Sequence, residues 1–585
     1  MKAADYIISF LKEQASTTIF SLSGWMITHL EDSIFLNPET TLVSVKHEQA
    51  WAFAAEWYTR VSWKSWVAMG TSGPGATNMI TGIASAYFDS VPVLYITWQV
   101  RTDELTPSDS RVRQTGFQET KIIPIVTPIT KYASHIEDIT LLRYELEKAY
   151  FLMHSGRKWP AVLDIPMNIQ RLDIDPTTLI SFYDSEEYLN YTKLNWVSKD
   201  IEIGILIEDI KNAKKPIILI GGGIRLSWSY SELAQFLEKS HIPVVASLMG
   251  IDAVDHTYDG YIGMIGSYGL RHANILLTEA DLVIVLGSRL DIRQTGAQKE
   301  KFAKQAKIVH VDIDPSELGY TVKHTQTKIN TDVKNFLNIL NDSEIQYPDY
   351  NDWYITINRL SALLPIYPAT SLHNLVHPNY FFARLTEIMP EWTVYVNDVG
   401  QNQMWSSQSL KLKSWDRLLN SGWLGSMWFS LPSALGAVFV PWVKKVVSLN
   451  GDGGFQMNIQ ELETISSRHL PIVIVVMNNK SLGMVREFQD TYFEGRNIGT
   501  VIGYSCPDLS LIAEAYRIPY FRIEHAEDVD TVFPQIQGVE GPYILEVMIS
   551  NKAIVEPKIL YGNTLDKQSP ELSPEIEQEI QNIIS

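Results

Sequence analysis

The strongest chemical signal in the chain is a glycine turn followed by a pair of asparagines at residues 478–479. The distance between them along the chain is about that of one βαβ unit. The motif GDGGF at residues 451–455 follows an apolar run, and its glycines let the backbone approach a diphosphate closely. Asp452 in this motif and Asn479, the second of the paired asparagines, offer hard oxygen ligands of the kind that Mg²⁺ prefers. Most GDG triplets are only turns, so the glycines alone are weak support for a cofactor. The paired asparagines at the end of the next strand strengthen the case for a cofactor site.

The residues between these two motifs fit one parallel crossover. Residues 458–464 predict a helix and residues 471–476 predict a buried parallel strand. Both ligands then lie at the carboxyl ends of neighbouring strands, where open α/β sheets bind ligands. The sequence therefore predicts a site for a diphosphate and a divalent cation at this edge of a sheet.

Composition and charge limit the remaining possibilities. The 585 residues suffice for about three or four domains, and no apolar run reaches membrane-spanning length. A formal charge of −19 opposes binding to nucleic acid or to an anionic membrane. The N-terminus enters helical periodicity directly, which argues against a secretory signal, and the single cysteine, Cys506, excludes an intramolecular disulfide framework. These features predict a cytoplasmic globular protein with no nucleic-acid or membrane partner.

Strand-like and helical segments alternate in three blocks, which predicts an α/β fold of three consecutive doubly wound parallel-sheet domains. We expect the domains at residues 1–175, 195–345 and 370–550, followed by a C-terminal arm at 551–585 that ends in a short helix. Polar stretches at 175–199 and 340–371 are interpreted as linkers. The strands expected are at 41–45, 66–69, 93–97 and 161–165 in the first block, 216–220, 282–286 and 308–312 in the second, and 393–396, 446–449, 471–476 and 543–547 in the third.

Two further motifs lie in the first block. HEQA at residues 47–50 follows a strand and opens a helix, and TSGPGATN at residues 71–78 follows the next strand. A lone glutamate at a helix start, such as Glu48, is ordinarily only a favourable partner of the helix dipole. Its neighbourhood changes that interpretation. In this order, HEQA, TSGPGATN and GDG…NN resemble the thiamin diphosphate (ThDP)-dependent decarboxylases and carboligases, specifically the acetohydroxyacid synthase (acetolactate synthase) branch, over nearly the whole chain.

This resemblance implies a role for each domain and for individual residues. The three domains would be pyrimidine-binding, central Rossmann-like and diphosphate-binding. Glu48 would exchange a proton with the aminopyrimidine ring of ThDP, and Gln118, in FQE at 117–119, would be a second catalytic residue. Asp452, Asn479 and the backbone carbonyl of Ser481 would hold Mg²⁺. The other residues implied in binding ThDP are Gly24, Pro74, Asn78, Val399, Gly400, Gln401, Asn402, Gly425, Met427, Gly453, Gly454, Gly483, Met484 and Val485.

The central block resembles the FAD-binding domain of the same family. GGG at 221–223 and GSRLDIRQTG at 287–296 carry the likeness, and the arginines offer donors to phosphate or ribityl oxygens. Glycine-rich strand ends alone are weak support, because Rossmann-like domains keep them for packing and related decarboxylases have an empty central domain. The residues implied in binding FAD are Arg157, Gly222, Gly223, Arg289, Asp291, Arg293 and Asp312.

Four positions depart from the family pattern on the expected acceptor side. Phe488 replaces a tryptophan that favours 2-oxobutyrate as acceptor, and Met167 replaces a lysine. Trp25 and Trp98 stand where the family has glycines. Trp25, Trp98 and Phe488 are expected to line the substrate pocket, which would suit a second pyruvate or present a flat apolar face to a sugar ring.

The resemblance implies a ThDP- and Mg²⁺-dependent carboligase that decarboxylates a 2-oxo acid, with pyruvate as the expected donor, and transfers the acyl carbanion to a carbonyl acceptor. The acceptor is a second pyruvate, giving acetolactate, or a keto sugar. A homodimer or homotetramer with active sites at the subunit interface is expected. One alternative is a non-oxidative 2-oxo-acid decarboxylase, but the paired histidines usual in that class are not evident. Another is a non-catalytic homologue, which the intact Glu48, Asp452 and Asn479 oppose.

Overall fold

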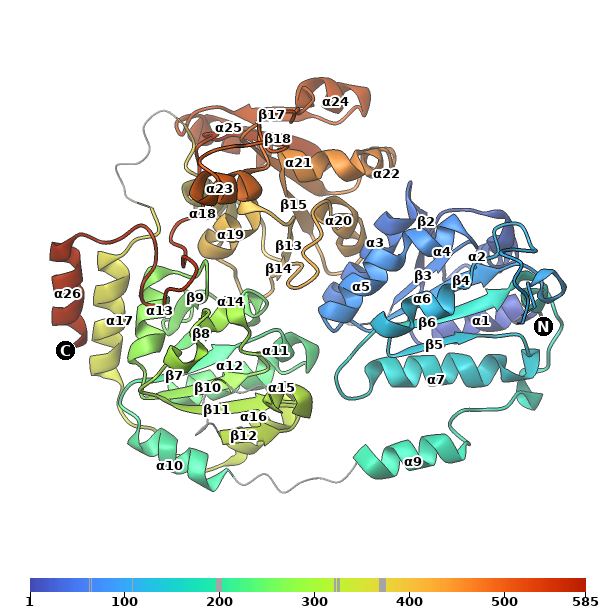
Figure 1. Cartoon of the computed structure of the whole chain (residues 1–585), viewed down its shortest axis with the longest axis horizontal. Coiled ribbons are helices and arrows are strands. Elements are labelled where there is room, and N and C mark those ends of the chain that lie inside the picture. The colour runs from blue at the N-terminus through green and yellow to red at the C-terminus, as the bar shows by residue number, and fades with distance from the viewer. Residues whose placement is uncertain are drawn as a thin grey trace.

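Three six-stranded parallel sheets, each flanked by helices, make up the chain (Figure 1). The computed structural model describes residues 1–62, 64, 66–107, 109–195, 203–319, 322, 327–367 and 375–585. Residues 196–202 and 368–374, which the sequence analysis assigns to linkers or domain ends, lie outside the described residues, as do 320–321 and 323–326. The expected α/β class with three parallel-sheet domains is confirmed.

The first sheet has the strand order β2-β1-β3-β4-β6-β5. Its strands are β1 (Thr18–Ser21), β2 (Thr41–Ser44), β3 (Trp66–Gly70), β4 (Val93–Gln99), β5 (Tyr132–His135) and β6 (Ala161–Pro166). Parallel neighbours need crossover connections, which helices supply here. They are α1 (Ala3–Glu13), α2 (Thr28–Leu36), α3 (Glu48–Ser62), α4 (Pro74–Asn78), α5 (Ile80–Phe88), α6 (Ile122–Val126), α7 (Leu142–His154) and α8 (Met167–Gln170).

The second sheet has the order β12-β11-β10-β7-β8-β9. Its strands are β7 (Pro216–Ile220), β8 (Val244–Ala246), β9 (Tyr261–Met264), β10 (Leu282–Leu286), β11 (Lys307–Asp312) and β12 (Thr327–Asn330). The helices around it are α10 (Gly204–Asn212), α11 (Gly223–Leu226), α12 (Tyr230–Ser240), α13 (Arg271–Glu279), α14 (Ile292–Thr295), α15 (Pro315–Gly319) and α16 (Val333–Asp342).

The third sheet has the order β14-β13-β15-β16-β18-β17. Its strands are β13 (Thr393–Asn397), β14 (Arg417–Leu419), β15 (Lys445–Gly451), β16 (Ile472–Asn478), β17 (Tyr520–Ile523) and β18 (Tyr543–Met548). Its helices are α18 (Pro378–Ile388), α19 (Gln401–Ser409), α20 (Ser430–Val438), α21 (Asp452–Phe455), α22 (Leu462–Ser467), α23 (Gly483–Tyr492), α24 (Leu509–Ala515) and α25 (Asp528–Ile536).

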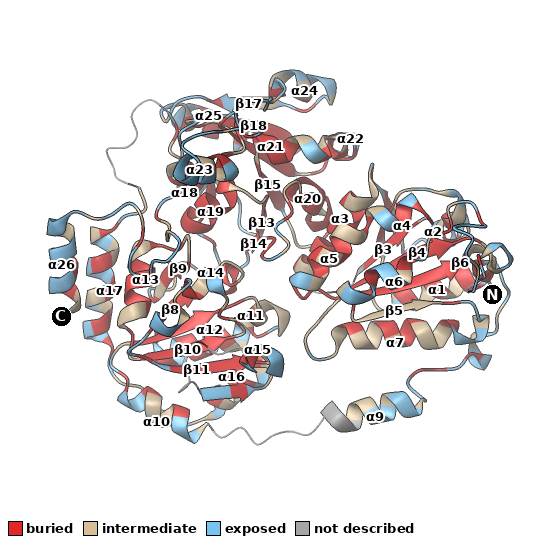
Figure 2. Cartoon of the chain, in the orientation of Figure 1, coloured by how far each residue is buried: buried red, intermediate tan, exposed pale blue. Residues whose placement is uncertain are grey.

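The central strands of all three sheets are buried on both faces, as Figure 2 shows. The first and third domains share one apolar core, in which α3 packs on α20. The two helices are so close that a Cβ on Gly436 would lie 2.0 Å from the carbonyl oxygen of Ala54. This contact fixes the helix that begins at Glu48 against the third domain.

The structure differs from the sequence expectations in the polar segments. The stretch expected as the first linker contains α9 (Glu186–Asn195), and the second contains α17 (Asn351–Leu363), which buries Trp353 against the central domain. The helix expected at 458–464 is broken: η8 (Gln456–Glu461) precedes α22, and Asn458 has a non-helical backbone (φ −129°). Its side chain instead donates to the carbonyl oxygen of Trp428 at 2.7 Å, so a tertiary contact overrides the helical pattern.

The C-terminal arm ends in α26 (Pro574–Ile584), which lies alongside α17 (Figure 1). The amine of Lys215 donates to the carbonyl oxygen of Ile584 at 3.1 Å, so the arm closes back on the central domain. In the described part of the chain, no helix is both long and apolar enough to span a membrane.

Candidate cofactor sites

Glu48 lies at the first position of α3, at the carboxyl edge of the first sheet. The side-chain amide of Asn78, the last residue of α4, donates to Glu48 Oε2 at 2.9 Å. Two hydroxyls of the same TSGPGATN segment, Thr71 Oγ1 and Ser72 Oγ, are buried without a hydrogen-bond partner among the described residues. The carboxylate is therefore oriented by a neutral donor, beside polar groups that remain available to a ligand.

Gln118 and Gly24 close around this segment. A Cβ on Gly24 would lie 2.7 Å from Thr71 Cβ, and one on Gly73 would lie 2.9 Å from Gln118 Cβ. The loop that carries Gln118 is fixed by Glu119, which accepts hydrogen bonds from Thr106 N at 2.8 Å and Thr106 Oγ1 at 2.6 Å. Gly24, Gln118 and the TSGPGATN residues Pro74 and Asn78 thus meet at one edge of the first domain, next to Glu48.

The residues expected to hold a cation meet at the carboxyl edge of the third sheet. Asp452 begins α21 directly after β15, and Asn479 follows the neighbouring strand β16. Asn479 Oδ1 accepts the backbone N–H of Ser481 at 3.0 Å, which makes a tight turn, and Ser481 Oγ is buried without a partner in the described structure. A carboxylate, an amide oxygen and a turn carbonyl therefore lie close together in the order that the spacing predicts.

Burial makes the carboxyl group of Asp452 a weaker acid than usual. Desolvation raises the pKa of Asp452 to about 6, although the hydroxyl of Tyr504, which donates to Oδ2 at 2.8 Å, opposes the shift. Within the described residues, no group of three or more His, Cys, Asp and Glu side chains could hold a metal. A cation at Asp452 would consequently need oxygens from the amide, the carbonyl and a bound anion. Mg²⁺ is commonly bound in this way, by one or two protein carboxylates together with phosphate oxygens of a bound molecule.

Glycines allow other side chains to pack closely beside these ligands. A Cβ on Gly454 would lie 1.7 Å from Asp398 Oδ2, and one on Gly483 would lie 1.9 Å from Gln401 Oε1. Asp398 Oδ2 is itself buried without a partner among the described residues, and burial raises the pKa of Asp398 to about 6. The residues expected to bind the cofactor or the cation lie at the starts of three helices: Val399, Gly400, Gln401 and Asn402 at α19, Asp452, Gly453 and Gly454 at α21, and Gly483, Met484 and Val485 at α23.

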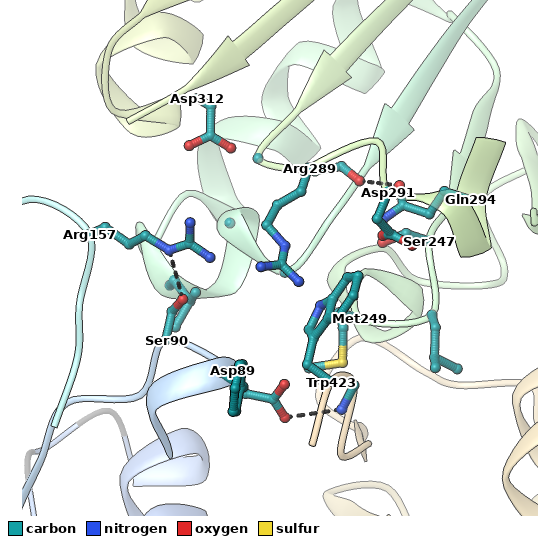
Figure 3. A pocket seen from close by; sticks show the side chains of 18 of the residues that line it. Asp89, Ser90, Arg157, Ser247, Met249, Arg289, Asp291, Gln294, Asp312 and Trp423 are labelled. Carbon is teal, nitrogen blue, oxygen red and sulfur yellow. Dashed lines mark hydrogen bonds between the residues drawn. The ribbon is translucent and has the colours of Figure 1, made fainter. Parts of the chain in front are cut away.

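A cavity, partly open to solvent, lies where the three domains meet (Figure 3). The first domain contributes Ser90 and Arg157, the second sheet contributes its glycine turns, and the third domain contributes Trp423. All the residues expected to bind FAD line it: Arg157, Gly222, Gly223, Arg289, Asp291, Arg293 and Asp312. A Cβ on Gly223 would lie 2.6 Å from Gly287 Cα, so the two glycine turns approach too closely for larger residues.

Charged groups are held in defined positions around the cavity. Arg157 donates to Ser90 Oγ at 3.0 Å and pairs with Asp314 at 3.1 Å. The Arg289 guanidinium lies 3.8 Å from the centre of the Trp423 ring, and its Nη2 is buried without a partner in the described structure. Burial raises the pKa of Asp312 to about 6. The cavity therefore offers arginine donors to phosphates and one carboxyl suited to a ribose hydroxyl.

Sequence reasoning missed several residues of this cavity. Asp89 and Ser90 follow α5 at the amino edge of the first sheet, and Met249 and Trp423 come from loops of the other domains. These residues carry no motif that points to a ligand. Only the packing of the three domains brings them to the cavity.

The four positions that are expected on the acceptor side have different surroundings. Trp25, in the short helix η1 (Trp25–Ile27), is 79% exposed, and Phe488, on α23, is 55% exposed. Met167 begins α8. Trp98 is fully buried within the apolar core of the first domain. Trp25 and Phe488 lie on surfaces that another molecule can reach, whereas Trp98 packs inside its domain.

Comparison with known proteins agrees with this arrangement. Three family models match: "Thiamine pyrophosphate enzyme, N-terminal TPP binding domain" at residues 1–125, "central domain" at 203–340 and "C-terminal TPP binding domain" at 398–547. The acetolactate synthase large subunit of Lactococcus lactis is 34% identical over 560 residues, which cover 95% of this chain and 94% of that protein. The chain belongs to the acetolactate synthase family of thiamine pyrophosphate enzymes.

Other members of the acetolactate synthase family match over a similar length. The acetolactate synthase isozyme 2 large subunit of Escherichia coli is 30% identical over 573 residues, covering 98% of this chain and all of that protein (100%). Acetolactate synthase 2 of Nicotiana tabacum chloroplasts is 32% identical over 575 residues, covering 96% of this chain and 84% of that protein. The buried partnerless oxygens at Thr71, Ser72, Asp398 and Ser481 fit the thiamine pyrophosphate that the family binds.

Proposed function

We propose that this enzyme is a ThDP- and Mg²⁺-dependent carboligase that decarboxylates pyruvate and joins the two-carbon unit to a second pyruvate. Two pyruvates and one proton then give acetolactate and carbon dioxide. Bound ThDP supplies the electron sink that lets carbon dioxide leave as the carbon–carbon bond breaks. The observation that carries the proposal is Glu48, which Asn78 orients at the start of α3 beside hydroxyls without partners.

The residues of the chain then have separate tasks. Glu48 holds and returns a proton at the aminopyrimidine, while Gln118 lines the same edge. Asp452, Asn479 and the Ser481 carbonyl would hold Mg²⁺, and the glycine turns around Gln401 would hold the diphosphate. Gly425, which has a left-handed backbone (φ +68°), and Met427 would support the bent cofactor from the third domain. Water must be kept out, because it would quench the carbanion before the acceptor is attacked.

A second subunit would complete each active site. The side-chain hydrogen bond of Glu48 stays in the first domain and that of Asp452 stays in the third. Large apolar side chains are exposed beside both half-sites, among them Phe117 next to Gln118, and Val485 and Phe488 on α23. Exposed apolar groups at an incomplete site favour burial against another copy. A homodimer is thus the smallest active unit proposed, and a homotetramer would be two such dimers.

FAD is the proposed occupant of the central cavity. The support is the set of arginines and glycine turns that line it, together with the partnerless Nη2 of Arg289. The protein would purify with a yellow chromophore, and Arg289→Ala would lower its retention by removing a charge-assisted contact. A colourless preparation that is fully active and does not respond to added FAD would contradict this assignment.

Product analysis tests the carboligase proposal. Purified protein with ThDP, Mg²⁺ and pyruvate should release carbon dioxide and form acetolactate, which mass spectrometry identifies. Acetaldehyde as the sole organic product would instead indicate a simple decarboxylase. If cofactor-dependent carbon dioxide release were undetectable, the chain would be a non-catalytic homologue.

A keto sugar is the second candidate acceptor, because Trp25 presents an exposed indole where the family has a glycine. The same assay with pyruvate plus a nucleotide-linked keto sugar should then yield a sugar extended by two carbons. We expect Trp25→Gly to change the acceptor ratio more than the rate of carbon dioxide release. An unchanged ratio would place Trp25 outside the acceptor pocket.

A further inference from the structure

One residue of the third domain, Gly422, is hydrogen-bonded on its two sides to side chains from the other two domains. The backbone N–H of Gly422 donates to Asp89 Oδ2 at 3.0 Å, and its carbonyl oxygen accepts from Arg293 Nη1 at 3.2 Å. Asp89 follows α5 of the first domain, and Arg293 lies on α14 of the central domain. All three residues line the cavity, and Figure 3 labels Asp89 among them.

The space around Gly422 allows little movement. A Cβ at this position would lie 2.6 Å from Met249 Sδ and 3.3 Å from Asp89 Oδ1. The loop that begins here reaches Gly425 and Met427, which are proposed to support the aminopyrimidine of ThDP. A small displacement of either cavity wall must therefore displace the loop as well, because a close-packed contact transmits strain.

Asp89 is also contacted from within its own domain. Its Oδ2 also accepts from Arg60 Nη1 at 3.3 Å, and the Arg60 guanidinium stacks 3.7 Å from the centre of the Trp57 ring. The other oxygen, Asp89 Oδ1, is buried without a hydrogen-bond partner in the described part of the chain, although its residue lines the cavity. An unpaired buried carboxylate oxygen is costly, so it is a strong acceptor for a donor on a bound ligand.

We propose that Asp89 is a positioning residue that links the two cofactor sites through Gly422. A flavin dinucleotide in the cavity orders Asp89 and Arg293, these fix Gly422, and the loop is then set for ThDP. The inference rests on the proposed occupant of the cavity. Since coupling between two binding sites is reciprocal, FAD must raise the affinity for ThDP by the same factor as ThDP raises the affinity for FAD.

Calorimetric titration of ThDP with Mg²⁺ into protein stripped of cofactors, with and without saturating FAD, tests the link. In the unmodified protein, FAD should lower the Kd of ThDP by a factor of about 5 or more, the lower end of typical allosteric coupling. Asp89→Asn keeps the side-chain shape but loses the charged acceptor. In this variant the ratio of the Kd of ThDP without FAD to the Kd with FAD should fall toward one. Ser90→Ala is the matched control: Ser90 lines the same cavity but bonds Arg157 rather than Gly422, so its ratio should be retained.

Arg293→Lys gives a second, independent route to the same result. Arg293 is exposed, so this variant should fold, and it removes the contact with the Gly422 carbonyl while keeping the charge. Its ratio should also fall. Flavin fluorescence quenching measures FAD binding separately. Failure of FAD to bind would contradict the proposed occupant, and the link with it. Binding of FAD that leaves the Kd of ThDP unchanged, or an unaltered ratio in both variants, would overturn the positioning role alone.

Discussion

Three tryptophans adopt a left-handed backbone conformation that favours glycine. They are Trp228 (φ 59°), Trp392 (φ 70°) and Trp428 (φ 74°). A bulky residue in this region costs roughly 1–2 kcal/mol because its Cβ crowds the following carbonyl. Trp428 directly follows Met427, so strain of this kind lies within the segment expected to support the aminopyrimidine.

Paired substitutions at Trp228 separate this strain from packing. Trp228→Gly and Trp228→Ala remove the same indole, but only glycine adopts φ 59° without a Cβ penalty. The glycine variant should therefore be more stable than the alanine variant, by about 1 kcal/mol. The thermal midpoints of the two proteins give the comparison. Equal midpoints, or a more stable alanine variant, would show that no strain is stored at this position.

Glu48 supports a prediction about proton transfer rather than binding. Glu48→Gln keeps the side-chain size and an oxygen that can accept from Asn78, so the fold and ThDP affinity should change little. Carbon dioxide release should fall by about 10²- to 10⁴-fold, the usual contribution of a positioned acid or base. Steady-state rates test the predicted loss of activity, and calorimetric titration of the same preparation tests whether the affinity for ThDP is unchanged. Near-normal carbon dioxide release would show that Glu48 is not the activating acid.

At the scale of elements, the start of α3 is tied to η8 of the third domain through one carboxylate. Glu461 is fully buried and accepts the backbone N–H of Lys46 at 3.0 Å (Oε1) and 3.2 Å (Oε2). Burial raises the pKa of Glu461 to about 7, although the hydrogen bond from Lys46 opposes the shift. The bond lies two residues before Glu48, so it sets where α3 begins.

This carboxylate makes the stability of the domain contact depend on pH. The folded-state pKa of about 7 is above the ordinary value of 4.5, so the contribution is complete below about pH 4.5 and is lost as the pH rises through 7. Glu461→Gln retains an acceptor but cannot ionise. Its thermal midpoint relative to the unmodified protein should therefore increase between pH 5 and pH 8, by an amount equivalent to about 1–3 kcal/mol.

Glu463→Gln provides the control, because Glu463 is exposed two residues further along the chain. Its midpoint relative to the unmodified protein should stay constant over the same range. A pH-independent difference for Glu461→Gln would mean that Glu461 is ionised throughout and that the contact is an ordinary charged hydrogen bond.

How far the sequence predicts these elements depends on their burial and length. Strands buried on both faces, such as β7, β10 and β16, read as continuous apolar runs and were predicted within a few residues. Short strands such as β8 and β14, each three residues long, leave no periodic pattern. The break at Asn458 could not be predicted either, since its cause is a bond to Trp428, thirty residues away in the sequence.

The candidate sites also differ in how far the sequence predicts them, because some are formed by nearby residues and others by residues far apart in the chain. Asp452 and Asn479 are brought together by one βαβ unit, so their spacing along the chain carries the information. Asp89, Arg293 and Gly422 come from three domains, and no local pattern relates them. The motif residues of the central cavity were predictable, but its wall from the other domains required the structure.

At the scale of the whole molecule, the residues proposed for catalysis and for cation binding are divided between domains. Glu48 and Gln118 belong to the first domain, and the expected cation ligands belong to the third. The core shared by α3 and α20 fixes these domains against each other within one chain. If each ThDP binds between the first domain of one subunit and the third domain of another, then every dimer has two sites that each draw on both chains.

Mixing two inactive variants tests this arrangement. Glu48→Gln damages the first-domain half of a site, and Asp452→Ala damages the third-domain half by removing a cation ligand. In a mixed dimer with shared sites, one site receives both defects and the other receives none. Random reassembly should therefore restore about a quarter of the sites, since half of the dimers are mixed and each has one intact site.

The assay is carbon dioxide release from pyruvate after the two variants are dissociated and reassociated together. Each variant reassociated alone is the control and should stay inactive. If each site were instead built within a single chain, no mixture could contain an intact one, and activity would remain at the level of the controls.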